Sequence, residues 1–186
     1  MRELGTRAST LLFAVVAATG LAAGADKMES GGAKAGRTRV IRSWPEPMTV
    51  KGQAVMGRIS YEFDYDAGVF SRIVQDASGR TLESKTYARG EIDVAPSDDE
   101  IAEAFEKVRS DPEFARIMDQ TGGQLMGGFV LNERAGLPCG PGARCIHVQI
   151  NSVDGWGLVR WAVVDLTKGA FAYRSYRPEM SQGGAQ

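Results

Sequence analysis

Histidine is almost absent from this chain of 186 residues, and His147 is the only one. Catalysis of the Ser-His-Asp or Cys-His type therefore has a single possible base. The chain also lacks the Gly-x-Ser-x-Gly turn that presents a nucleophilic serine. We predict from these absences that the protein is not an enzyme. A small hydrolase is the alternative, and it would require a pocket in which His147 lies beside a serine and a carboxylate.

An excess of charge of one sign is also missing. Lysine and arginine number 22, aspartate and glutamate number 23, and the formal net charge is -1. Nucleic acids and anionic membranes bind surfaces where basic residues are concentrated. One short basic run with little aromatic content is interpreted as a solvated arm: Lys34, Arg37, Arg39 and Arg42. We predict no nucleic-acid partner and no membrane partner.

Long apolar runs are missing except near the start, at Leu11–Ala23. Arg2 and Arg7 precede this run, and Ala23-Gly24-Ala25 ends it with small residues. A charged start, a short apolar centre and a small-residue end are typical of a cleavable secretory signal. The run is too short to cross a bilayer comfortably. We predict a signal peptide at 1–25 and a soluble product exported to the periplasm or the medium.

Cysteine is scarce, since Cys139 and Cys145 are the only two. An even number of cysteines in an exported chain favours a disulfide. A redox motif would have two intervening residues, whereas five stand here. We predict a disulfide that fixes the loop Pro138–Cys145, and such a loop on a rigid scaffold is a natural contact element.

Two blocks with different periodicity lie between a predicted flexible arm at 26–36 and a flexible tail at 181–186. The first block, 37–95, is predicted to be a β-meander. Apolar and polar residues alternate over Ile59–Tyr65, which places the apolar side chains on one face of a strand. Turn residues separate this strand from two others: Val69–Gln75 and Arg80–Tyr87.

The second block, 96–180, begins with helix signals. Ser97 and Glu100 have the spacing of a capping box. An apolar stripe follows at helical spacing: Ile101, Ala104, Phe105 and Val108. Asp111-Pro112 starts a second short helix, and antiparallel strands with a hairpin at Asp154-Gly155 come after it. We predict a single α+β domain at 37–180, an antiparallel sheet with one or two amphipathic helices packed on one face.

Two segments of the second block carry a family resemblance. The helix opening Ser97–Ile101 and the late strand and turn Val163–Phe171 resemble exported PepSY modules and the small N-terminal domains of secreted copper amine oxidases, which are cystatin-like. The resemblance covers about Pro96 to Pro178. It implies a cystatin-like α+β fold and a non-catalytic accessory role. Oxidase chemistry is not implied, because that family's copper centre requires three histidines and a tyrosine-derived quinone.

Copper handling is the alternative function, based on His147 and the methionines of an exported chain. His147 is a weak metal candidate, because its neighbours on the same strand face are Cys145 and Gln149 and a disulfide would remove the thiolate. Scattered methionines could bind Cu(I) in an exported protein: Met48, Met56, Met118, Met126 and Met180. Because they are scattered and Met118 lies on an apolar helix stripe, core packing and chance are the favoured explanation of these methionines. We predict no bound metal or cofactor, with a copper-handling secreted protein as the alternative.

Aromatic and arginine side chains gather in the last two predicted strands: Trp156, Arg160, Trp161, Tyr173 and Arg174. This composition is typical of a binding surface, provided that one sheet face is left bare. Trp156 and Trp161 are five residues apart and are therefore predicted on opposite faces. The predicted function is an exported, non-catalytic binding or inhibitory module that acts on a peptide or on another exported protein.

Overall fold

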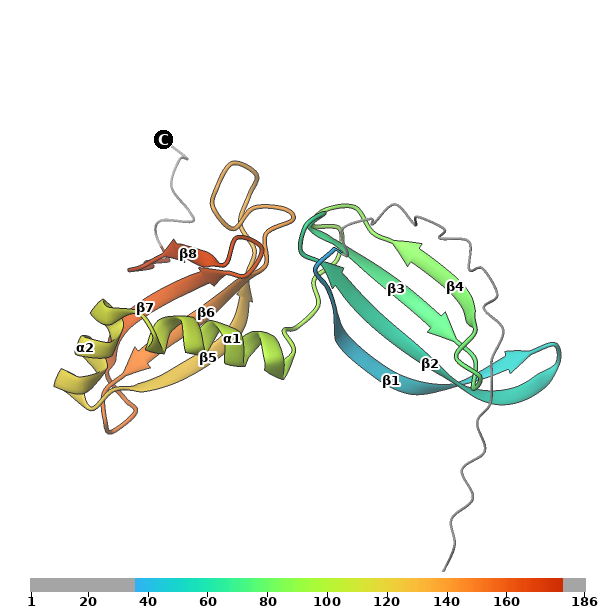
Figure 1. Cartoon of the computed structure of the whole chain (residues 1–186), viewed down its shortest axis with the longest axis horizontal. Coiled ribbons are helices and arrows are strands. Elements are labelled where there is room, and N and C mark those ends of the chain that lie inside the picture. Colours follow the sequence, from blue (N-terminus) through green and yellow to red (C-terminus); the bar gives the residue numbers. More distant parts are fainter. Residues whose placement is uncertain (1–35, 179–186) are drawn as a thin grey trace, which may run out of the picture. The chain divides into compact units, whose positions relative to one another are not determined.

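A computed structural model describes residues 36–178 of the chain. The predicted signal peptide (1–25), the arm (26–36, apart from its last residue) and the tail (181–186) lie outside the described residues. The described part forms two four-stranded antiparallel sheets and two short helices (Figure 1), with 45% of residues in strands and 15% in helices. None of its helices is long and apolar enough to cross a membrane.

The protein is therefore mostly β, and the predicted α+β, cystatin-like class is wrong. The first block builds a complete sheet of its own, with strand order β1-β2-β3-β4. The prediction missed its first strand, β1 (Thr38–Val50), because two prolines and two arginines interrupt the apolar alternation there: Pro45, Pro47, Arg39 and Arg42. Proline is tolerated on this strand because β1 lies at the sheet edge and pairs only with β2.

The first sheet is a meander of β1, β2 (Gln53–Asp64), β3 (Val69–Gln75) and β4 (Thr81–Thr86). Lys51 and Gly52 join β1 to β2 with φ values of 53° and 79°. Positive φ at both central residues is the requirement of a type I′ hairpin turn, whose twist matches that of the paired strands.

Two helices precede the second sheet. Ser97 caps the start of helix α1 (Asp98–Arg109), and the predicted capping box of Ser97 with Glu100 is confirmed. Helix α2 (Pro112–Thr121) has the Asp111 carboxylate as its cap and ends at Gly122 in the left-handed conformation. The second sheet then runs in chain order through β5 (Gln124–Leu131), β6 (Cys145–Asn151), β7 (Leu158–Asp165) and β8 (Ala170–Tyr173).

The two faces of the second sheet have different neighbours. One face packs on the helices in the main core, where Val148 and Ala162 lie beside Ala104 and Val108 of α1 and Phe114 of α2. The opposite face, called the outer face below, holds a separate buried cluster: Cys139, Cys145, Val163 and Tyr176, with Trp161 and Tyr173 packed against it. No described helix contributes to that cluster. Neither α1 nor α2 therefore covers this face of the sheet.

A buried ion pair joins α1 to the residue before β6, and a hydrogen bond adds the residue after β2. The Arg144 guanidinium donates to both Glu100 carboxylate oxygens at 2.7 and 2.8 Å, and Tyr65 donates to the same carboxylate at 2.7 Å. Arg144 also donates to the Val94 carbonyl at 2.8 Å. Burial alone would raise the pKa of Glu100, but Arg144 and Tyr65 together lower the pKa below its usual value. The carboxylate is therefore charged and fully paired.

Candidate functional site

The outer face carries a cluster of aromatic rings at its centre. His147 on β6 meets Trp161 on β7 edge to face, with ring centroids 4.9 Å apart. Tyr176 lies 5.2 Å from His147 and 5.1 Å from Trp161, and its backbone N–H donates to the Trp161 carbonyl at 2.6 Å. The segment after β8 therefore continues along β7 and holds Tyr176 over the other two rings.

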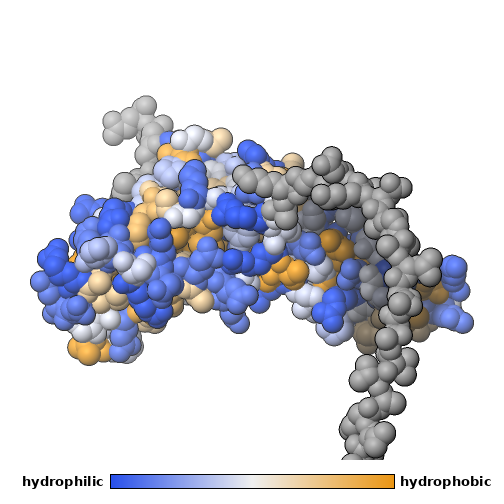
Figure 2. Space-filling model, viewed as in Figure 1, coloured by the Kyte–Doolittle hydropathy of each residue, from blue (hydrophilic) through white to orange (hydrophobic). Residues whose placement is uncertain are grey.

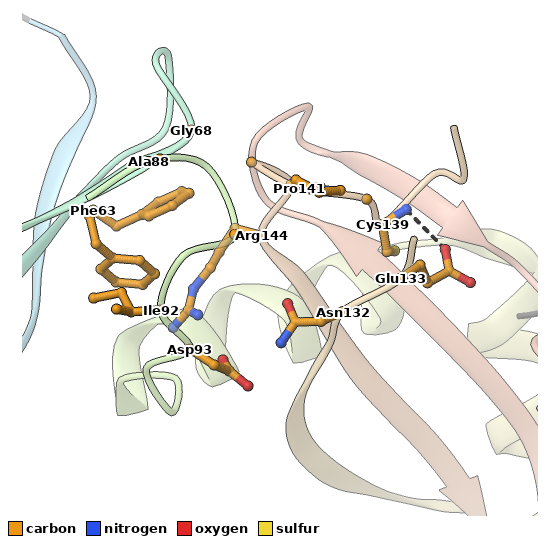
Figure 3. A pocket seen from close by; sticks show the side chains of 15 residues that line it. Phe63, Gly68, Ala88, Ile92, Asp93, Asn132, Glu133, Cys139, Pro141 and Arg144 are labelled. Atoms are coloured by element: carbon orange, nitrogen blue, oxygen red, sulfur yellow. Dashed lines mark hydrogen bonds between the residues drawn. The ribbon is translucent and has the colours of Figure 1, made fainter. Parts of the chain in front are cut away.

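Glu133 holds the side of this cluster where Tyr173 and Cys139 lie. Its carboxylate accepts hydrogen bonds from the Tyr173 hydroxyl at 2.9 and 3.1 Å and from the Cys139 backbone N–H at 3.0 Å. Figure 3 shows the contact of Glu133 with Cys139. Burial, and then the hydrogen bond to Glu133, raises the pKa of Tyr173 to about 12. Tyr173 is therefore a neutral hydrogen-bond donor to Glu133 at physiological pH.

The predicted metal candidate His147 is enclosed in this cluster. Burial lowers the pKa of its imidazole, although the charge of Glu133 acts in the opposite direction, so the ring is neutral at pH 7. Its Nε2 atom is buried and finds no hydrogen-bond partner among the described residues. The described chain contains no group of three or more histidine, cysteine, aspartate or glutamate side chains arranged to hold a metal ion.

The methionines of the copper alternative are not gathered around His147. Met118 packs against the main core, Met126 accepts from Asn151, and Met48 lies over Gly57 in the first sheet. Met56 is exposed on β2, and Met180 lies outside the described residues.

Toward the β6–β7 hairpin the outer face is a mixture of exposed apolar side chains, Met126 and Leu158, and polar ones, Gln124, Gln149 and Asn151. Met126, Gln149 and Trp161 are direct cross-strand neighbours on β5, β6 and β7 and so share this face. In the next row, closer to the hairpin, Leu158 of β7 pairs with Asn151 of β6. The side chains of Leu158, Val159 and Met126 are exposed.

The β6–β7 hairpin ends this surface with Trp156, whose side chain is 92% exposed. The hairpin is ordered by its own hydrogen bonds. The Asp154 carboxylate accepts from the Trp156 N–H at 3.1 Å, and the Ser152 hydroxyl accepts from the Gly157 N–H at 2.9 Å. Val153 beside it is 69% exposed. Figure 2 shows apolar surface at the lower left, where Figure 1 places this hairpin.

The predicted contact surface is only partly brought together. Trp161 and Tyr173 share the outer face, and Trp156 lies at the hairpin at its end. Arg160 and Arg174 lie on the helix side, where both form ion pairs with Glu113 of α2. Arg174 also lies over the rings of Phe114 and Phe171. The prediction that Trp156 and Trp161 face opposite sides does not apply, because Trp156 stands in the turn, outside β7.

The predicted disulfide between Cys139 and Cys145 is confirmed. Its loop, however, packs against the first sheet. A β-carbon added at Gly68 would lie 2.5 Å from the Gly142 carbonyl oxygen, and one added at Gly90 would lie 3.1 Å from Pro141. Figure 3 shows the loop with Pro141 on the side of the two segments that carry Gly68 and Ala88. This loop is an internal contact of the fold.

A small cavity of about 150 Å³ lies beneath the loop. Its polar lining includes Arg144, Glu133 and Asn132, and Figure 3 shows Arg144 extending beside Phe63 and Ile92. Both Arg144 and Glu133 are already engaged, by Glu100 and by Tyr173. No histidine, serine or free thiol lines the cavity.

Sequence reasoning missed several residues of the site. Val153, Leu158 and Val159 flank the Asp154-Gly155 turn and were expected as ordinary strand residues. One sequence signal could have indicated their exposure. Apolar residues stand on both sides of a tight turn, and the turn itself contains Trp156. Glu133 gave no signal, because its partner Tyr173 is 40 residues away in the sequence.

A comparison with models of known protein families finds none that matches this chain, and a comparison with curated proteins finds no match either. The resemblance to PepSY and amine-oxidase accessory modules therefore remains a prediction.

Proposed function

We propose that the protein is an exported, non-catalytic binding module whose partner is another exported polypeptide. The observation that carries this proposal is the outer face, which neither of the described helices covers and which ends at the exposed Trp156. A large, exposed tryptophan is typical of the residues that dominate binding energy at interfaces. The hydrogen-bonded turn supports this role, because a preformed loop loses little conformational freedom on binding.

Export is part of the proposal and is supported by two features. The first 25 residues have the pattern of a secretory signal. The buried disulfide fits an oxidising compartment, where such bonds form and persist.

The test is an affinity capture with a matched pair of variants. Trp156→Ala removes the hairpin tryptophan, and Leu82→Ala removes an exposed leucine of β4 in the other sheet. The immobilised purified protein is exposed to the secreted and periplasmic proteins of the producing cell, and retained polypeptides are quantified by mass spectrometry. We expect one partner to be retained equally by wild type and Leu82→Ala and about 30-fold less by Trp156→Ala, the effect of a 2 kcal/mol hot spot. Equal retention by Trp156→Ala would contradict the proposal.

A further inference from the structure

The aromatic cluster of the outer face contains one side chain that can change its charge near neutral pH. His147 is the only histidine of the chain, and its ring contacts those of Trp161 and Tyr176. Its Nε2 atom is buried and has no hydrogen-bond partner among the described residues. Both ring nitrogens of an imidazolium are donors. Protonation would therefore create a buried, charged donor that lacks an acceptor, which is costly while the rings stay packed.

Glu133, which follows β5, is the charged group that favours a protonated His147. Its carboxylate already accepts hydrogen bonds from the Tyr173 hydroxyl and from the Cys139 N–H. Tyr173 of β8, with its pKa raised to about 12, stays neutral under acidic conditions. Burial outweighs the attraction of Glu133, so the pKa of His147 is lowered from its usual value.

The strands on either side of the histidine supply no further counter-charge. On β6 the adjacent side chains of the same face are Cys145, which is in the disulfide, and Gln149. On β7 the direct partner of the histidine is Val163, and Asp165 stands two residues further along. The Asp165 carboxylate is paired with the Lys168 ammonium at 2.8 Å. An imidazolium would thus gain little from these neighbours.

The segment after β8 is the part of this cluster that can move. Arg174 anchors its start, because the guanidinium donates to the Asp111 carboxylate at 2.6 Å. Beyond Arg174 the segment belongs to no helix or strand, and Tyr176 is its buried residue between exposed neighbours. The Tyr176 N–H donates to the Trp161 carbonyl at 2.6 Å. Local opening of a native protein occurs most readily in such short peripheral segments.

We propose that the aromatic cluster is a pH-sensitive switch, in which protonation of His147 releases Tyr176 and its segment from β7 and exposes Trp161. The proton comes from the solvent and remains on the imidazole in the open form. Trp161 lies in one row with Gln149 and Met126, so opening enlarges the exposed part of the outer face. The opening itself does not depend on the proposed function.

The direction of the switch follows from proton linkage. The closed cluster binds the proton less tightly than the open form, in which water reaches the imidazole. The closed form is therefore favoured above the ordinary histidine pKa of about 6.5 and loses that advantage as the pH falls below it. One proton is taken up on opening, so the opening constant rises by up to about tenfold for each pH unit in this range.

The test is amide hydrogen exchange of the purified protein, followed by NMR between about pH 7.5 and about pH 5. The Tyr176 N–H reports the opening. The Tyr87 N–H, bonded to the Phe70 carbonyl at 2.8 Å in the first sheet, is the matched control. After correction for intrinsic exchange, the opening constant at Tyr176 is expected to rise up to about tenfold per pH unit below about 6.5. That at Tyr87 is expected to stay constant.

Two variants remove the charge in different ways. His147→Phe keeps a ring in the cluster, and His147→Gln keeps a polar side chain, so either one serves if the other does not fold. In both, the opening constant at Tyr176 is expected to be independent of pH over the same range.

Three results would overturn the proposal. They are an opening constant at Tyr176 that does not change with pH in the wild type, the same pH dependence in the His147 variants, and an equal pH dependence at Tyr87. The second result would assign the effect to carboxylates, and the third to unfolding of the whole protein. None of them bears on partner capture through Trp156, which is measured separately.

Discussion

At the residue scale, the buried contact of Arg144 with Glu100 is the most demanding feature of the fold. Both side chains are almost completely buried, at 2% and 0% exposure. Two charges removed from water are tolerated only when each is paired and hydrogen-bonded. Here the carboxylate also accepts from Tyr65 and from the Ser97 backbone at the start of α1. One carboxylate thereby fixes the first sheet, the helix start and the segment before β6.

Glu100→Gln removes the negative charge with little change in shape and leaves Arg144 buried without a counter-charge. We expect a loss of about 3–5 kcal/mol in the free energy of unfolding, measured by urea denaturation. Glu103→Gln is the matched control on the same helix, since Glu103 pairs with Arg39 at 2.7 Å in a more exposed position. That variant should lose less than about 1 kcal/mol. Similar losses in the two variants would show that the buried pair has no special role.

At the scale of elements, each outer strand of the two sheets bears a feature that discourages pairing with another chain. β1 has two prolines, and irregular pairing interrupts the ladders of β1, β4 and β5. β8 is only four residues long, and the chain then continues along β7 through Tyr176. Such features protect native sheets from edge-to-edge association. A partner is therefore expected to use side chains of the outer face rather than to add a strand.

The disulfide loop gives a second element-scale prediction. Gly68 and Gly79 both stand in hairpin turns of the first sheet with positive φ, at 68° and 82°. A side chain at Gly79 meets open space, whereas one at Gly68 meets the Gly142 backbone. Gly79→Ala should cost about 1–2 kcal/mol, the penalty of the left-handed conformation. Gly68→Ala should cost about 1–3 kcal/mol more, because the loop must move.

Thermal unfolding of these two variants checks this contact. If Gly68→Ala and Gly79→Ala lose the same stability, the loop does not rest on the β2–β3 turn. The pair also isolates the contact from backbone strain, which the two positions share.

Local features of this fold could be read from the sequence because they depend on near neighbours. The capping box of Ser97 and Glu100 spans three residues, and the Cys139–Cys145 disulfide spans six. Contacts between residues that are far apart in the sequence gave no such signal. Glu100 lies 44 residues from Arg144 and 35 from Tyr65 in the sequence. The sequence therefore predicted only its capping role and not its buried ion pair.

The fold class failed for a related reason. The edge strand β1 has exposed positions on both faces and two prolines, so its sequence does not alternate like a strand that lies on a core. Without β1 the first block appeared to be an appendage of one α+β sheet. The binding surface was predicted in part. Trp156 and Trp161 were identified by residue type. Arg160 and Arg174 instead form ion pairs with residues at the start of α2, and the pattern of the strands does not contain that information.

At the scale of the whole molecule, the account assigns different tasks to the two faces of the second sheet. The inner face joins α1, α2 and the first sheet into the main core. Among the described residues, the outer face is covered in part by its own aromatic cluster and is exposed toward the hairpin. A sheet that buries one face in the core and exposes the hairpin end of the other supports the proposed binding module.

Site-specific photo-cross-linking in the producing cell tests this central claim most directly. A photoreactive phenylalanine derivative replaces Trp156 or Leu158 at the hairpin, or Leu82 on β4 as the control position, all three exposed. The account predicts one discrete cross-linked polypeptide from positions 156 and 158 and none from position 82. Absence of an adduct at the hairpin, or the same adduct from position 82, would contradict it.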